Sequence, residues 1–243
     1  MTTSLIKTLQ TSEPRGGPLD TAILQGHGIS SALAHDYVKS GWLERLGRGV
    51  FMFAGDKLER DTTLRFLERK MPGIHVAAKS ALAWHGFRQN VEHRESLILW
   101  GYRKGSLPQW FLERFPARFS SARLFDEELP DGFGLSPLPE APEGPGVSTP
   151  ERALLEMLSE VGVHQSIEEA RAIMESLRQL RTRHLATMIA HCRMTKAVRL
   201  CVIWAEELGL TWAEKAREAA GGKTSSSRWV KRLKDGRTLI LKP

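Results

Sequence analysis

Three polar side chains recur every four residues between positions 31 and 39, a spacing that places them on one side of a helix. Ser31, His35 and Lys39 lie on this side together with Asp36, and Ser30 stands directly before the helix as a candidate cap. Their hydroxyl, imidazole and ammonium groups can donate hydrogen bonds to base edges or phosphates. The opposite side is apolar, with Ile29, Leu33, Tyr37 and Val38. The pattern predicts a helix that contacts DNA through Ser30, Ser31, His35 and Lys39.

A short β-hairpin with a basic tip is predicted directly after this helix. In the segment SGWLERLGRGVFMF, residues 40–53, two apolar runs flank a stretch with two arginines and two glycines. Gly47 and Gly49 allow a tight turn and a close approach of the backbone. Arg45 and Arg48 would then reach phosphates or the minor groove beside the helix. In the alternative interpretation, the unit docks proteins and the arginines only keep a strand edge soluble.

The segments before the hairpin complete a recognisable order of elements. Helices are predicted over residues 3–10 and 20–25, followed by a sharp turn at residues 26–28 and by the helix that Gly41 ends. Two helices, a turn, a third helix and a hairpin make up a winged helix-turn-helix, whose helix after the turn enters the major groove of DNA. We therefore predict a DNA-binding domain over residues 1–55.

Residues 56–243 are predicted to form a larger domain of mixed α+β structure with a helical layer. Strands are expected near 75, at 96–102, 117–125 and 135–138, and at the end of the chain, with helices at 61–71, 79–85 and after 107. A series of helices follows residue 148. Ser148 or Thr149 is expected to cap the first of them, and Ser166 the second, with Glu169 as its capping-box partner. The fold class is thus α+β.

Composition narrows the classes of function. The 243 residues include no apolar run of the ~20 residues that cross a bilayer, and the N-terminus lacks a secretory pattern. Cys192 and Cys201 are expected to be free thiols in a reducing compartment. We therefore expect a cytoplasmic protein without a membrane partner. Its net charge of +7 permits a polyanionic partner.

Charge is unevenly distributed in the second domain. Residues 126–175 contain twelve acids and two arginines, whereas residues 176–199 contain six Lys or Arg and no acid. In a continuous helix, Arg193, Lys196 and Arg199 would lie near one face and could attract an anionic partner, such as an acidic protein, RNA, a nucleotide or flanking DNA. The alternative is that the basic stretch neutralises the acidic one.

Three groups of residues hint at enzyme chemistry without completing a motif. AGGKTSSS, residues 220–227, ends like a phosphate-binding loop but has Arg217 where the first glycine belongs. His184, His191 and Cys192 lack a clear further metal ligand. The acidic run at residues 126–128 has no accompanying lysine pattern. We therefore predict no catalytic residue, no metal site and no cofactor.

Five segments together resemble the AbiEi-type antitoxins of type IV toxin–antitoxin systems, and the resemblance spans nearly the whole chain. They are VKSGWLERLGRGVF (38–51), GIHVAAKSALAWHGF (73–87), LPQW (107–110), STPERALLEML (148–158) and TKAVRLCVIWAEELGLTW (195–212). The resemblance implies a non-enzymatic protein whose winged helix represses its own promoter, with inverted repeats expected in that double-stranded DNA. It also implies a second domain that counteracts a nucleotidyltransferase-like toxin, for which direct contact is not required.

The residues themselves are also compatible with two other classes of function. A winged-helix regulator without a toxin partner could use its second domain to sense a ligand or to dock a protein. An enzyme such as a nuclease could be targeted by the winged helix.

Overall fold

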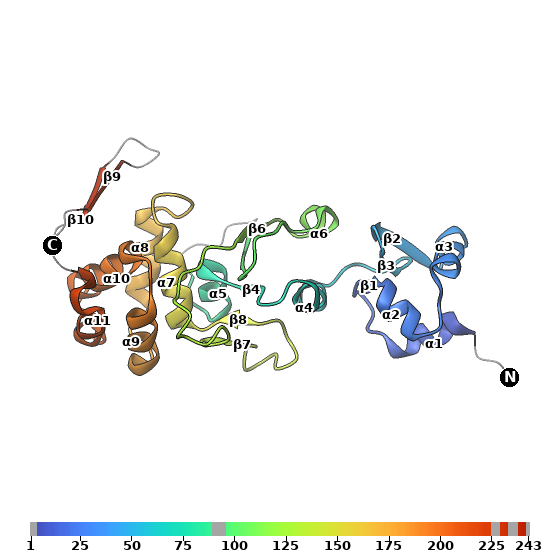
Figure 1. The fold of residues 1–243 in the computed structure, drawn as a ribbon, viewed down its shortest axis with the longest axis horizontal. Coiled ribbons are helices and arrows are strands. Elements are labelled where there is room, and N and C mark those ends of the chain that lie inside the picture. Colours follow the sequence, from blue (N-terminus) through green and yellow to red (C-terminus); the bar gives the residue numbers. More distant parts are fainter. Residues whose placement is uncertain (1–3, 89–95, 225–228, 233–237, 242–243) are drawn as a thin grey trace.

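The polypeptide builds two hydrophobic cores, one formed by residues up to Phe53 and the other by residues from Leu64 onward. The computed structural model describes residues 4–88, 96–224, 229–232 and 238–241. Figure 1 shows the first unit at one end, a sheet in the middle and a layer of helices at the other end. No helix among the described residues is long and apolar enough to cross a membrane.

The first unit has the winged helix-turn-helix order that the sequence predicts. Its three antiparallel strands are arranged β1-β3-β2, with the helices packed on one side. The elements are α1 (Leu5–Ser12), β1 (Leu19–Asp20), α2 (Thr21–Gly26), α3 (Ser31–Lys39), β2 (Leu43–Gly47) and β3 (Val50–Phe53). Strand β1, which pairs with β3, is not predicted from the sequence.

Local signals begin and end the helices of this unit. The Asp20 carboxylate accepts a hydrogen bond from the Ile23 N–H at 2.8 Å and caps α2. The Ser30 hydroxyl accepts from the Leu33 N–H at 3.2 Å and caps α3, as predicted. Gly41, with φ of +76°, follows α3 in a conformation that residues with a side chain rarely adopt.

Helix α4 (Arg60–Lys70) joins the two units and contacts both. The Glu59 N–H donates to the Gly16 carbonyl oxygen at 2.8 Å, and the Lys70 ammonium pairs with the Asp20 carboxylate. Burial raises the pKa of the Asp20 carboxyl, but Lys70 and the Ile23 N–H outweigh it, so that pKa lies below its ordinary value. The cap of α2 is therefore also a link to α4.

A five-stranded mixed sheet forms the centre of the second unit. Its strand order is β6-β5-β4-β8-β7, with parallel pairing in β4–β8 and β5–β6. The strands are β4 (His75–Val76), β5 (Leu97–Trp100), β6 (Ala117–Ser120), β7 (Leu135–Ser136) and β8 (Val147–Ser148). Strand β6 ends at Ser120, earlier than expected, and β8 was missed. Helices α5 (Ala78–Trp84) and α6 (Gln109–Arg114) belong to the same region.

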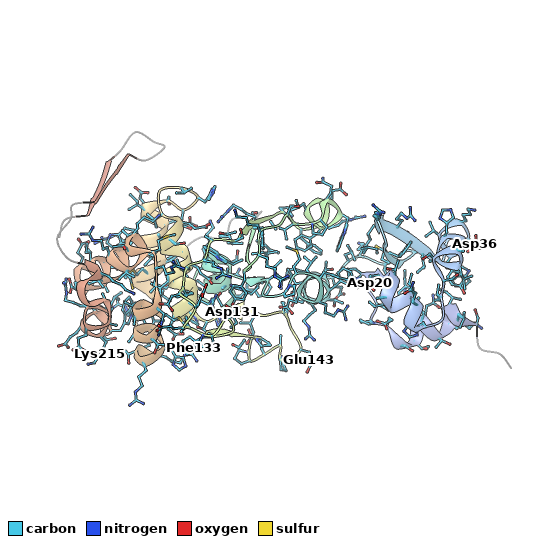
Figure 2. The ribbon with its side chains drawn as sticks, viewed as in Figure 1. Asp20, Asp36, Asp131, Phe133, Glu143 and Lys215 are labelled. Atoms are coloured by element: carbon cyan, nitrogen blue, oxygen red, sulfur yellow. The ribbon has the colours of Figure 1, made fainter. Side chains whose placement is uncertain are left out.

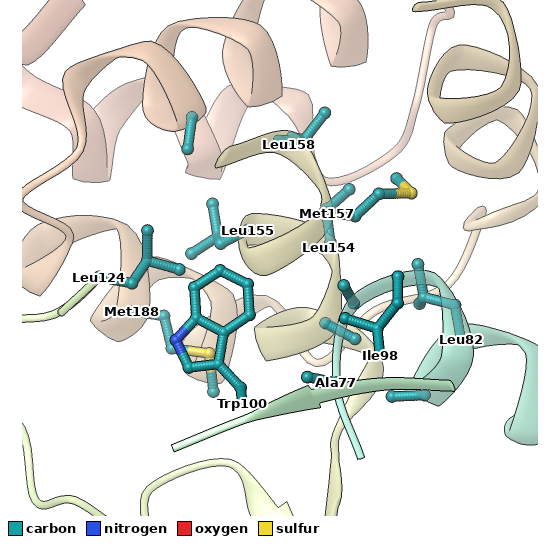
Figure 3. Close-up of a cluster of buried hydrophobic side chains, with 14 of the residues drawn as sticks. Ala77, Leu82, Ile98, Trp100, Leu124, Leu154, Leu155, Met157, Leu158 and Met188 are labelled. Carbon is teal, nitrogen blue, oxygen red and sulfur yellow. The ribbon is translucent and has the colours of Figure 1, made fainter. Parts of the chain in front are cut away.

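The helical layer is built around α7 (Pro150–Glu160), in which every residue from 151 to 160 is buried. Figure 3 shows Leu154, Leu155 and Met157 of α7 among side chains from β5, α5 and α9. The other helices are α8 (Ile167–Ser176), α9 (Thr182–His191), α10 (Thr195–Glu207) and α11 (Ala213–Ala220), with a 3-10 turn at Gly221–Thr224. A hairpin of β9 (Trp229–Arg232) and β10 (Thr238–Leu241) follows, so the expected last strand is present.

Two predicted capping details of this layer are wrong. The Ser148 hydroxyl donates to Glu156 at 2.8 Å, and the Thr149 side chain forms no capping bond to α7. Ser166 does cap α8, but the Glu169 carboxylate accepts from Lys79 and Gln165, at 2.8 and 2.7 Å. The distant Lys79 and the neighbouring Gln165 thus take the place of the capping-box bond.

A buried carboxylate, Glu156, joins the helical layer to the sheet. Its oxygens lie 3.2 Å from His75 Nε2, 2.9 Å from Arg152 Nε, 2.8 Å from Ser148 Oγ and 3.0 Å from the Ala78 backbone nitrogen. Burial raises the pKa of the Glu156 carboxyl, but His75, Arg152 and the Ala78 N–H outweigh it and hold that pKa below its ordinary value. The carboxylate is therefore charged and saturated with donors.

Arg152 extends this network to the loops beyond the sheet. Its Nη1 donates to the Phe133 carbonyl oxygen at 2.7 Å, and its Cζ lies 5.0 Å from the centre of the Phe125 ring. Ala78, the one described non-glycine residue with positive φ (48°), is held by the bond from its N–H to Glu156. The network thus fixes two loops and a strained start of α5.

Replacing Glu156 with Ala should lower the free energy of unfolding by about 3–5 kcal/mol, because it leaves the Arg152 guanidinium buried without a counter-charge. Urea denaturation of the full-length protein measures the change. The matched control is Glu206→Ala, which removes an exposed carboxylate paired with Arg217 and should cost at most about 1 kcal/mol. Similar losses for both variants would contradict this account.

Candidate nucleic-acid interface

The outer face of α3 presents the polar residues that the sequence predicts. Ser31, His35 and Lys39 are all exposed, whereas Ala34 between them is buried in the first core. Ser30 is exposed too, although its hydroxyl oxygen is engaged in the cap. Figure 2 places Asp36, on the same helix, at the end of the molecule that faces away from the second unit. The face of α3 is therefore open to a large partner such as DNA.

The wing is a tight hairpin whose turn consists of Arg48 and Gly49. Gly47 pairs with Val50 across the turn, and Gly49 has φ of +69°. The Thr21 N–H donates to the Gly49 carbonyl oxygen at 3.2 Å, which ties the turn to the start of α2. The turn is thus attached to the helix pair that presents α3.

Both predicted wing arginines are exposed, and each has a defined place. Arg48 stands in the turn itself. Arg45 pairs in register with Phe51 across the hairpin, and its Cζ lies 5.7 Å from the centre of that ring. Because Phe51 belongs to the first core, Arg45 lies on the face of the wing that carries the helices. Both guanidinium groups are accessible to phosphate.

Charge pairing leaves these cations available. Arg15 is bound to Asp56, and His27 lies 2.9 Å from Glu13. Within the described part of the chain, Lys39, Arg45 and Arg48 form no ion pair. They therefore present positive charge on α3 and the wing that can meet a phosphate backbone, although the exposed carboxylate of Asp36 lies on the same helix.

The wing is not surrounded by solvent, because one of its faces contacts the second unit. Leu46 and Val50, on the face opposite Arg45, pack against the core of the second unit. The backbone of Gly47 lies against the Trp110 ring of α6. Arg45 and Arg48 are exposed as predicted, but the end of the hairpin lies against the second unit.

The prediction that Arg193, Lys196 and Arg199 form an exposed basic face in the second unit is wrong. Arg199 is only 3% exposed, because it lies on the side of α10 that packs into the core. Lys196 is half-buried and donates to the Val161 carbonyl oxygen at 3.0 Å. Arg193 is exposed but precedes α10, which begins at Thr195. The three residues therefore share no exposed face, since the helix is not continuous and two of them are drawn inward.

Part of the basic stretch pairs with the acidic one, as the alternative interpretation holds. Arg181 Nη2 lies 2.9 Å from the Glu151 carboxylate, and its backbone N–H donates to Glu151 at 2.8 Å. Burial raises the pKa of the Glu151 carboxyl, but these bonds outweigh it and lower that pKa. Arg118, from β6, similarly binds Glu160.

The incomplete enzyme motifs have structural partners. Lys223 belongs to the AGGKTSSS segment, which resembles the end of a phosphate-binding loop in sequence. Its ammonium donates to the carbonyl oxygens of Ile189, Ala190 and Cys192 at the end of α9. Residues 225–227 of that segment lie outside the described residues. His191 lies 2.9 Å from Asp126. In the described ranges, no three His, Cys, Asp or Glu side chains are grouped to hold a metal ion.

The two cysteines are free and buried. Burial raises the pKa of the Cys192 thiol to about 11 and raises that of Cys201 further. Neither thiol is therefore activated as a nucleophile.

The fold defines a winged helix-turn-helix protein with a large second domain of α+β structure. Two family models match the chain. "Transcriptional regulator, AbiEi antitoxin N-terminal domain" matches residues 2–93, and "Transcriptional regulator, AbiEi antitoxin, Type IV TA system" matches residues 94–240. The chain belongs to the AbiEi family of antitoxins and transcriptional regulators of type IV toxin–antitoxin systems, which confirms the resemblance seen in the sequence. The first match extends beyond the winged helix and includes residues of the second core such as Leu64 and Leu82.

A solved structure shares the fold. The crystal structure of RV2827C protein from Mycobacterium tuberculosis matches with a TM-score of 0.60 and 14% identity, covering 92% of this chain and 81% of that one. No curated protein sequence matches the chain.

Replacing His35 with Ala should weaken binding to the DNA upstream of the protein's own gene by about 1–3 kcal/mol, if His35 reads a base edge. Binding to random DNA of the same length should change much less. Fluorescence anisotropy on both DNAs measures the difference, with the exposed His164 of the second domain replaced by Ala as the control. Equal losses on the two DNAs would show that His35 reads no base.

Replacing Arg48 with Ala should weaken binding to every DNA sequence, because a phosphate contact carries no base information. The slope of log K against log salt concentration should become shallower by about one unit. Titrations at four or more salt concentrations measure this slope. Arg183→Ala, which removes an exposed arginine from α9, is the control. An unchanged slope for Arg48→Ala would mean that the wing points away from DNA.

Proposed function

We propose that this protein represses its own promoter through α3 and the wing, and counteracts a nucleotidyltransferase-like toxin encoded beside it. The observation that carries the first part is the set of exposed, unpaired cations on α3 and the wing, Lys39, Arg45 and Arg48. Family membership supports the second part. The operator is expected to be double-stranded DNA with inverted repeats, and the protein to act without catalysis.

We assign the two roles to different parts of the chain. Residues 1–55 would bind DNA through Ser30, Ser31, His35, Lys39, Arg45 and Arg48, and residues 56–243 would carry the antitoxin activity. The separate hydrophobic cores support this division, because each part can bury its own apolar residues. Neutralisation would not require direct contact with the toxin.

Co-expression with the neighbouring toxin gene, driven from an unrelated promoter, tests both roles. The wild-type protein should restore the growth that the toxin alone stops. A variant with Lys39→Ala and Arg48→Ala should still restore growth but should fail to repress a reporter driven by its own promoter, because it loses only phosphate contacts. The unrelated promoter excludes rescue by repression of the toxin gene.

Failure of the wild type to restore growth would refute the antitoxin role and would favour a regulator without a toxin partner. Loss of rescue in the double variant, with its fold intact by circular dichroism, would refute the division of roles between the two parts.

A further inference from the structure

The tip of the wing rests against one aromatic ring of the second domain. A Cβ atom added at Gly47 would lie 2.9 Å from Trp110 Cδ1 and 3.5 Å from Trp110 Nε1. Side chains do not approach a neighbour at 2.9 Å without a shift, so the absence of a side chain at Gly47 is what admits the ring. Gly47 does not have the positive φ of Gly49. Close approach, rather than backbone conformation, therefore accounts for this glycine.

Trp110 is itself held firmly. The ring is 8% exposed and packs edge-on against Phe66 of α4 and against Phe111, with centroid distances of 6.1 and 6.2 Å. Phe66 and Phe111 are buried in the second core. The surface that meets the wing is therefore a rigid part of the second domain and not a mobile side chain.

Further contacts fix the wing on both sides of its turn. Leu46 and Val50 pack against the second core, and the Gly49 carbonyl oxygen accepts from the Thr21 N–H. Asp20, next to Thr21, pairs with Lys70 of α4, and Figure 2 shows Asp20 on the side of the first unit that faces the second. The turn that carries Arg48 thus has Trp110 on one side and the start of α2 on the other, while the Arg48 side chain stays exposed.

We propose that Trp110 is a positioning residue for DNA binding, which holds the wing tip so that Arg48 meets a phosphate. The inference rests on the proposed binding of the promoter by α3 and the wing. Arg48 lies next to Gly47 in the chain, so a shift of Gly47 off the ring moves the Arg48 backbone with it. The second domain thereby contributes to DNA affinity without touching DNA at this residue.

The experiment is a double-mutant cycle in the full-length protein with Trp110→Ala, Arg48→Ala and both together. The probe is the DNA fragment upstream of its own gene, titrated at several salt concentrations. Trp110→Ala should weaken binding several-fold and flatten the salt slope by about one unit, as Arg48→Ala does. The double variant should bind almost as well as either single variant, because Trp110 acts through Arg48. Trp110→Phe should restore much of the loss.

Loss of core stability alone is controlled by Trp204→Ala. Trp204 is 4% exposed in the same core but lies on α10, at the opposite end of the second domain from the wing. The Trp204→Ala variant should lower the melting temperature about as much as Trp110→Ala does and should leave the salt slope of DNA binding unchanged. Gly47→Ala gives a second approach, because it displaces the wing without emptying the core, and it should reproduce the shallower slope at near wild-type stability.

Additive losses in the cycle, or an unchanged slope in both Trp110→Ala and Gly47→Ala, would overturn the inference. If Trp110→Ala does not fold, the Gly47→Ala result decides alone. A wild-type protein that binds the fragment no better than random DNA would refute the proposed function, and this inference with it. A preference that survives in the wild type together with an unaffected Gly47→Ala variant would refute the inference alone.

Discussion

The second domain depends on one buried negative charge. Glu156 binds donors from β4 and the start of α5, at residues 75–78, and from the end of β8 and the start of α7, at residues 148–152, so one carboxylate joins segments about seventy residues apart. A charge in this position is costly unless every donor is placed, because nearby water cannot replace a missing one. Its donors His75 and Ser148 lie on the adjacent strands β4 and β8, so the parallel pairing of these strands and the charge require each other.

The elements that the sequence predicts well are those that local chemistry defines. Helices α2 and α3 of the first unit are delimited by Asp20, Ser30 and Gly41, whose roles depend on residues within one turn. Strands β1 and β8, which the sequence does not predict, have two residues each, too few for an alternating pattern, and they exist because distant segments pair with them. Such strands are consequences of the fold rather than signals in the sequence.

The exposed cations of α3 and the wing were predictable, but the basic face at Arg193, Lys196 and Arg199 was not. A spacing of three residues indicates a common face only if the helix continues, and the chain leaves α9 before Arg193. Charge also does not guarantee exposure. The long side chain of Arg199 lies in the core, whereas the short loop before α10 leaves Arg193 in solvent. Burial therefore depended on packing around α7, which no local pattern reports.

The wing packs against the helices of its own unit on one face and against the second domain on the other. The face with Arg45 and Phe51 packs against the helices that present α3, and the face with Leu46 and Val50 packs against the second domain. Gly47 and Gly49 serve different needs within this turn, close approach to Trp110 and a left-handed backbone. Because the turn has only two residues, the exposed Arg48 directly follows Gly47, which lies against Trp110. A displacement of Gly47 from Trp110 would therefore also move the backbone of Arg48, which couples the proposed DNA-binding surface to the contact between the domains.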